Sequence, residues 1–151
     1  MDTRLTDYLQ KRQCSTQWQP FLSALAEEFS AQLPEADLRT LMQRIGAVFA
    51  AAHPLSACAT LQELEQALNQ YWSSQDWGWV ELQEEADHLS LRHHLSPLHA
   101  AFGESAAAWS PAFLESAYQT WLRQLGMGDK LTIKQASALD SLGSVAFRLS
   151  V

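Results

Sequence analysis

Four of the five histidines lie within twelve residues, at His88, His93, His94 and His99, beside several carboxylates. Imidazole and carboxylate groups are ligands that zinc prefers, so this segment is the best candidate for a metal site. On a strand, however, His93 points away from the face that His88 and His94 share, and the helical two-histidine motif with an intervening glutamate is absent. We therefore predict no metal and no cofactor, and expect histidines on a polar strand face that titrate near neutral pH.

Acidic side chains form a second cluster, made of Glu81, Glu84, Glu85 and Asp87. Two such carboxylates can flank a scissile bond in a glycosidase, provided that a walled cleft sets the pKa of one of them. These acids instead surround the expected tip of a β-hairpin, where solvation is the simpler interpretation. Because the sequence also has no phosphate-binding glycine loop, no Gly-x-Ser-x-Gly elbow and no Cys-His pair at a known spacing, we predict no catalytic residues and no enzyme.

Tryptophan is concentrated between residues 71 and 82. Trp77 and Trp79 come after the end of a helical pattern and stand at the start of a strand pattern. On that strand the two indoles would alternate with Val80 and Leu82, so they would face outward if the aliphatic pair faces the helices. An outward aromatic pair needs a partner or a ligand to cover it. We favour a subunit interface over a sugar-binding platform, because no polar sugar-binding groups surround the pair in the sequence.

The composition predicts one domain. The chain has 151 residues, is 47% hydrophobic and carries a net charge of -7, which argues against nucleic acid or an anionic membrane surface as the partner. Cys14 and Cys58 lie in no paired motif and are expected to be free thiols. With neither a secretory signal nor a transmembrane run, we expect a cytoplasmic protein without membrane insertion.

Periodicity divides the chain into a polar arm, residues 1–17, and a single domain, residues 18–151. The arm is aperiodic and is expected to be flexible. Apolar residues then recur at helical spacing, and Trp18, Trp72 and Trp121 fall on these stripes as predicted core residues. The first two helices have the stripes Trp18, Phe21, Leu22, Leu25, Phe29, Leu33 and Leu38, Leu41, Met42, Ile45, Val48, Phe49.

A third helix should begin at the Thr60 cap, with Glu63 completing a capping box. Alternation then predicts a hairpin over 77–83 and 88–95, and Ser110-Pro111 should open a fourth helix that Gly126 and Gly128 end. Residues 131–134 and 144–151 alternate as two more strands. The order helix-helix-helix-hairpin-helix-strand-strand predicts an α+β fold, with helices packed on one face of a small antiparallel sheet.

Three segments of the chain resemble the D-subunit family of bacterial cellulose synthase. They are Phe21-Leu22-Ser23-Ala24-Leu25, Trp77-Gly78-Trp79-Val80-Glu81-Leu82, and Trp109-Ser110-Pro111-Ala112-Phe113-Leu114-Glu115 with Tyr118 and Trp121. The resemblance implies a non-enzymatic accessory protein of cellulose biosynthesis that forms a cylindrical octamer of dimers. It also implies a role in organising nascent glucan chains or synthase complexes into ordered cellulose.

The resemblance further implies inner channels lined partly by the N-terminal arms. Tyr8, Gln10, Gln13 and Gln17 of this arm are then the candidate glucan contacts. The expected partners are other copies of the chain, the subunits of the cellulose synthase complex and β-1,4-glucan chains. Because no export signal is present, organisation of synthase complexes from the cytoplasmic side is the favoured mechanism.

Two alternatives follow from the residues without the resemblance. The first is a cytoplasmic adaptor domain whose Trp77/Trp79 face binds another protein. The second is a metal- or sugar-dependent enzyme, which stoichiometric zinc or hydrolysis of a β-glucan would reveal.

Overall fold

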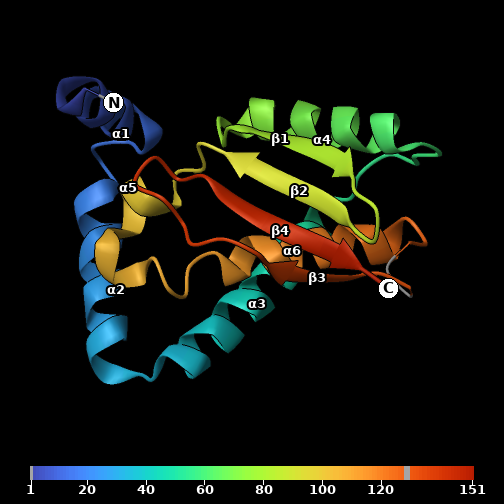
Figure 1. Cartoon of the computed structure of the whole chain (residues 1–151). Coiled ribbons are helices and arrows are strands. Elements are labelled where there is room, and N and C mark those ends of the chain that lie inside the picture. The colour runs from blue at the N-terminus through green and yellow to red at the C-terminus, as the bar shows by residue number, and fades with distance from the viewer. Residues whose placement is uncertain (1, 128–129) are drawn as a thin grey trace.

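The computed structural model describes residues 2–127 and 130–151, and within them the chain has an α+β fold, as predicted. Helices cover one face of a four-stranded antiparallel sheet (Figure 1). In the described part of the chain, no helix is long and apolar enough to span a bilayer. The elements are α1 (Thr3–Gln13), α2 (Gln19–Gln32), α3 (Glu35–Ala52), α4 (Leu61–Gln75), β1 (Trp79–Glu84), β2 (Leu89–His94), α5 (Leu98–Phe102), the 3₁₀ helix η1 (Glu104–Ala106), α6 (Ala112–Gln124), β3 (Thr132–Gln135) and β4 (Val145–Ser150).

The sheet has the strand order β1-β2-β4-β3, with every neighbouring pair antiparallel. Leu91 of β2 stands opposite Leu82 of β1 and Phe147 of β4, and this register puts the apolar side chains on one face. Arg92 and Arg148 lie on the other face and are exposed. Period-two alternation in the sequence therefore gives a sheet with one buried and one open face.

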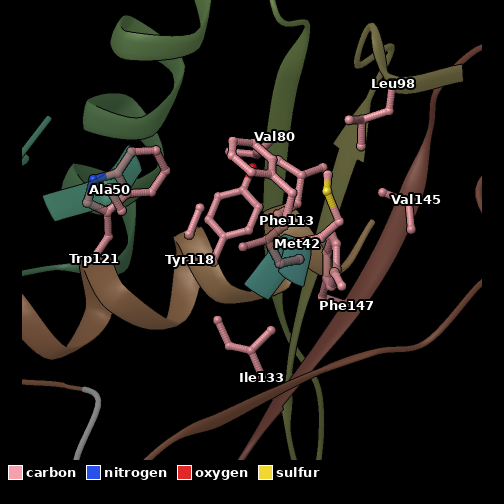
Figure 2. Packing of buried hydrophobic residues seen from close by; sticks show 14 of the residues in the cluster. Met42, Ala50, Val80, Leu98, Phe113, Tyr118, Trp121, Ile133, Val145 and Phe147 are labelled. Atoms are coloured by element: carbon pink, nitrogen blue, oxygen red, sulfur yellow. The ribbon is translucent and has the colours of Figure 1, made fainter. Parts of the chain in front are cut away.

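The core lies between the apolar sheet face and the helices. Trp72 of α4, Tyr118 and Trp121 of α6 and Phe147 of β4 are all fully buried, and Figure 2 shows three of them turned toward the same interior. The burial of Trp72 and Trp121 confirms that their helical stripes face inward. These aromatic rings contribute much of the burial that stabilises the fold.

Helix α3 packs on α6 rather than on the sheet, and the contact depends on a glycine. A Cβ atom built on Gly46 would lie 2.3 Å from the carbonyl oxygen of Phe113 and 3.0 Å from the backbone nitrogen of Ala117. The two helix backbones therefore approach too closely for any side chain at position 46.

Helix α4 begins at the predicted capping box. Thr60 Oγ1 accepts a hydrogen bond from the Glu63 amide at 3.1 Å. The Glu63 carboxylate reaches back to the Ala59 amide at 2.7 Å, so two N-terminal donors are satisfied.

Both edge strands of the sheet are capped by polar side chains from a helix. On β1, Asn69 accepts from the Val80 amide at 2.7 Å and donates to the Val80 carbonyl at 3.0 Å, while Glu65 accepts from the Leu82 amide at 2.8 Å. Glu65 and Asn69 are four residues apart, so they lie on the same side of α4. The β1 edge is thus partly closed to further strands.

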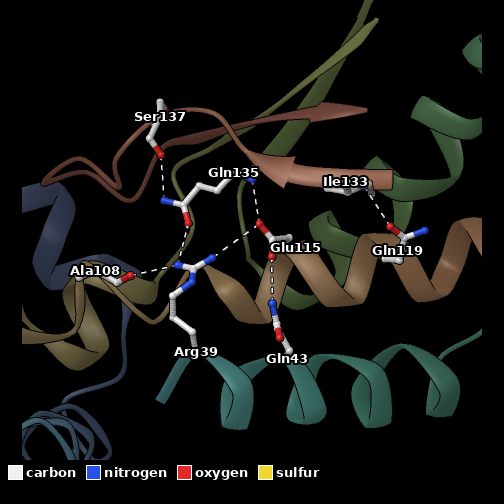
Figure 3. A network of polar contacts seen from close by, with 8 residues as sticks. All are labelled: Arg39, Gln43, Ala108, Glu115, Gln119, Ile133, Gln135 and Ser137. Carbon is white, nitrogen blue, oxygen red and sulfur yellow. Dashed lines mark hydrogen bonds and ion pairs between the residues drawn. The ribbon is translucent and has the colours of Figure 1, made fainter. Parts of the chain in front are cut away.

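The β3 edge is capped in the same way by a second pair four residues apart, Glu115 and Gln119 of α6 (Figure 3). Gln119 accepts from the Ile133 amide at 3.0 Å and donates to the Leu131 carbonyl at 2.9 Å. Glu115 accepts from the Gln135 amide at 2.8 Å. Helices α4 and α6 therefore hold the two edges of the sheet.

The N-terminal arm differs from prediction, because most of it is the helix α1 and not a flexible segment. Asp2 caps this helix by accepting from the Arg4 amide at 2.9 Å, and Lys11 and Arg12 lie in its last turn. Local capping and charge placement stabilise α1, since no residue of it is buried. The division into arm and domain remains a prediction.

Two smaller differences lie between the hairpin and α6. The stretch that looked irregular contains α5 and η1, which are too short for a periodic signal. Helix α6 starts at Ala112, with Pro111 as its cap residue, and the Ser110 hydroxyl caps nothing. Gly126 follows the helix with a positive φ of 83°, as a stop residue should, whereas Gly128 lies outside the described residues.

Candidate functional site

Helices α2 and α3 diverge from a corner at Pro34 and form the two arms of a V (Figure 1). Helix α2 packs on α5 and η1, whereas α3 packs on α6, so the space between the arms stays open. This space is a groove of about 760 Å³. Its lining is almost entirely apolar and includes Leu22, Leu25, Phe29, Leu41, Met42, Phe49, Pro97, Leu98, Phe102, Trp109 and Phe113.

The rims of the V carry large apolar side chains that the chain itself does not cover. Trp18 and Ile45 lie in the groove lining, and Phe21 and Val48 lie three residues further along the chain from them. On α2, Phe21 is 57% exposed, and Trp18, just before the helix, is 55% exposed; their rings meet edge to face at 6.0 Å. On α3, Ile45 is 44% and Val48 72% exposed. All four were predicted to face a core, and that prediction was wrong because periodicity identifies a common helix face but not what covers it.

Trp77 also differs from prediction, because it does not face outward beside Trp79. Its indole stacks on Trp72 with ring centroids 5.3 Å apart and lies 5.5 Å from the Phe113 ring. Gly78 has a φ of 82°, and a Cβ there would lie 1.8 Å from the His94 carbonyl oxygen. Because β1 begins only at Trp79, strand alternation does not extend back to Trp77, which instead lines the groove.

Trp79 does lie on the open face of the sheet, where it is 45% exposed. Its indole stacks on the His94 ring at 5.0 Å, and His94 Nε2 lies 3.0 Å from a carboxylate oxygen of Glu81. Beside it is a smaller cleft of about 480 Å³, whose lining includes Arg12 and Asp76. The interface role of Trp77 and Trp79 remains a prediction.

His93 is fully buried instead of lying on a polar face, and it belongs to a closed hydrogen-bond network. Its Nε2 lies 2.6 Å from the Trp77 carbonyl, which can only accept, so Nε2 carries the proton. Nδ1 then accepts from the Tyr118 hydroxyl at 2.5 Å, and that hydroxyl accepts from Trp72 Nε1 at 2.9 Å. Burial lowers the pKa of His93 to about 4 and raises that of Tyr118.

The other three clustered histidines each have a separate carboxylate neighbour. His88 Nδ1 lies 2.7 Å from Asp87, and His99 Nε2 lies 2.8 Å from Glu104, while His94 is paired with Glu81 as above. Among residues 2–127 and 130–151, no three His, Cys, Asp or Glu side chains are grouped so as to hold a metal ion. The histidine cluster therefore consists of three separate histidine–carboxylate pairs and the buried His93.

The acidic residues near the hairpin tip lie in solvent, as the sequence suggested. Asp87 accepts from Arg148 of β4 at 3.0 Å, and the hydrogen bond from His88 together with the Arg148 charge lowers its pKa. Glu84 and Glu85 are exposed. A carboxylate pair that cleaves a glycoside needs one carboxyl group with a raised pKa, and the pKa of Asp87 is shifted in the opposite direction.

Two of the four predicted glucan contacts in the arm are engaged within the chain. Gln10 and Gln13 donate to the carbonyl oxygens of Ser141 and Leu142, at 2.5 Å and 2.6 Å. Tyr8 is exposed beneath the Arg12 guanidinium. Gln17 lies in the turn between α1 and α2 and is exposed. The structure thus does not bring these four side chains together.

Comparison with known proteins gives one consistent result. A sequence model of the family described as the cellulose synthase D-subunit matches residues 4–149. Proteins named cellulose synthase operon protein D from Komagataeibacter xylinus and from Komagataeibacter sucrofermentans are each 27% identical to this chain over 124 residues. The match covers 80% of this chain and 80% of each relative.

Proposed function

Because the chain belongs to the D-subunit family of cellulose synthase, we propose that it is a non-catalytic accessory subunit of bacterial cellulose biosynthesis. In this proposal it assembles into a ring-like oligomer, an octamer built of dimers. The assembly organises synthase complexes or nascent glucan chains, so that cellulose is exported in an ordered form.

The observation that carries self-assembly is the open V of α2 and α3. Large apolar side chains that lie exposed beside one another usually mark a surface that binds another molecule. Here a groove of about 760 Å³ is bordered on both rims by exposed aromatic and aliphatic side chains. Such a surface is typical of a protein that works in an assembly and not of one that acts alone.

The proposed partners are other copies of the chain, subunits of the synthase complex and β-1,4-glucan. We place the assembly on the cytoplasmic side, next to the inner-membrane synthase. If the arm contacts glucan, Tyr8 and Gln17 are available as they stand, whereas Gln10 and Gln13 would first have to leave the carbonyls of residues 141 and 142. Cell fractionation tests the location, and recovery in the periplasm would overturn it.

The test of the function as a whole is the solution mass of the full-length protein, combined with an assay on β-glucan. We expect a defined species of about eight times the 16.9 kDa chain mass and no release of soluble sugar. A monomer at all accessible concentrations would overturn the self-assembly, and reproducible hydrolysis would overturn the non-catalytic role.

A second candidate function is a protein-binding adaptor, which the Trp79 surface favours. Exposed Trp79 stacks on the partly buried His94, on a sheet face that no element of the described chain covers. A stable monomer that co-purifies with a protein of the synthase complex, and loses it on Trp79→Ala, would support the adaptor function instead.

A further inference from the structure

We propose that the V of α2 and α3 is closed by the same V of a second copy, related to the first by a two-fold axis. In this arrangement the Trp18/Phe21 rim of each copy enters the groove of the other. The inference rests on the proposed function, because it names the surface that pairs two copies within the assembly.

The V is complementary to itself, as a two-fold interface must be. In such an interface one surface patch has to supply both the pocket and the group that fills it. The groove, with Trp77 and Phe113 among its lining, supplies the pocket. Trp18 and Phe21 on one rim and Ile45 and Val48 on the other supply the projecting groups. A two-fold axis along the V therefore satisfies both copies at once.

The size of the surface fits a pair of copies better than a single anchoring side chain. At their observed exposure, Trp18 and Phe21 together leave on the order of 200 Å² of aromatic surface in water. Ile45, Val48 and the groove walls add to this surface, and a stable interface buries roughly 800 Å² on each partner. These side chains and walls would form the apolar centre of such an interface.

Charges border the apolar surface on opposite arms. Glu28 is exposed on α2, and Arg44 is exposed on α3. Neither has an ion-pair partner among the ion pairs of the described residues. When α2 of one copy lies along α3 of the other, acidic and basic side chains meet at the border, as in the polar rim of an interface.

Pairing of two copies through the edges of their sheets is less favourable than pairing through the V. Asn69 and Glu65 occupy the outer edge of β1, and Gln119 and Glu115 occupy that of β3. A copy that extended the sheet would have to displace these side-chain hydrogen bonds. Pairing through the V leaves all of them intact.

The decisive experiment compares two charge insertions in the full-length protein by light scattering at several concentrations. Phe21→Glu/Val48→Glu puts one carboxylate on each rim, at positions that are already exposed in the single chain. We expect it to weaken pairing by roughly 100-fold or more, because burying a carboxylate among apolar side chains costs much free energy. Trp79→Glu is the matched control on the sheet face, and we expect it to retain at least the two-copy species.

A second measurement needs no substitution and so does not depend on folding of the variant. In the unaltered protein, hydrogen exchange of residues 18–29 and 41–49 should slow as concentration rises, whereas residues 79–84 should change little. If the wild type assembles but the rim variant keeps its mass, or if Trp79→Glu alone gives monomers, the V is not the pairing surface and the proposed function stands. If the wild type is itself a monomer, self-assembly fails and this inference fails with it.

Discussion

At the scale of single residues, the His93 network shows how a polar group is accommodated in this core. Every polar atom of the imidazole has a partner, and the Tyr118 hydroxyl both donates and accepts. Only the neutral ring fits this arrangement, because a proton on Nδ1 would displace the Tyr118 hydroxyl proton, which would then lose its acceptor in the buried network. The network therefore stabilises the fold only while His93 is neutral.

This leads to a pH dependence with a defined sign. The folded pKa of His93 is about 4, below the usual 6.5, so the unfolded chain binds more protons between these values and stability falls as the solution is acidified. From pH 7.5 to pH 5 we expect His93 to remove roughly 2 kcal/mol from the free energy of unfolding. Urea denaturation of the wild type and of His93→Gln at both pH values measures the difference, and equal pH dependence of the two would contradict the prediction.

Substitution of Gly46 by alanine tests the contact between α3 and α6, because helix propensity and steric clash change the free energy of unfolding in opposite directions. In an exposed helix, Gly→Ala raises stability by about 1 kcal/mol. Here the new Cβ would lie 2.3 Å from the Phe113 carbonyl oxygen, so α3 must move away from α6. We expect Gly46→Ala to lower the free energy of unfolding by about 1–3 kcal/mol. Thermal denaturation measures the change in stability, and any gain would show that the two helices are not in close contact.

At the scale of whole elements, α4 and α6 stabilise the sheet through its edges as well as through its core. Asn69→Ala would leave the Val80 amide and carbonyl without their partner. We expect a loss of about 1–3 kcal/mol and a greater tendency to aggregate through the exposed strand. Gln70→Ala removes a side-chain carboxamide of the same kind from the exposed side of α4, and it is the matched control. Equal unfolding midpoints for the two variants would rule out the edge contact.

These elements also show what the sequence could predict and what it could not. The capping box at Thr60, the hairpin and the order of helices and strands follow from local patterns, and the structure confirms them. The edge caps were missed because Glu65 and Asn69 look like ordinary polar helix residues until the register of β1 is known. Polar helix α1 was missed because it buries nothing, so it leaves no hydrophobic period.

The candidate site was visible in the sequence but was assigned to the wrong environment. Trp18, Phe21, Ile45 and Val48 repeat as regularly as true core residues, because a surface that packs against another molecule obeys the same periodicity as one that packs inside. The composition gives no signal either, because 47% hydrophobic residues is an ordinary proportion for a globular domain. Spacing alone does not identify which of them remain outside.

At the scale of the whole molecule, α1 is the element with the weakest attachment to the rest of the chain. It contributes no buried residue, and the side-chain hydrogen bonds that join it to the rest of the chain are those of Gln10 and Gln13 to the segment before β4. The compact part of the molecule is therefore expected to begin near α2. This expected start agrees with the boundary after residue 17 that the polar composition predicted.

Removal of residues 2–16 tests that boundary directly. Two hydrogen bonds of about 0.5–1.5 kcal/mol each are lost, and α1 has no buried residue. We therefore expect less than about 3 kcal/mol of destabilisation and one cooperative unfolding transition. Gln10→Ala/Gln13→Ala in the full-length chain should account for most of that change. Circular dichroism and urea denaturation give both quantities. A shortened chain that unfolds without a cooperative transition would mean that α1 is part of the domain, because the hydrogen bonds to residues 141 and 142 would then be needed to hold β4 in place.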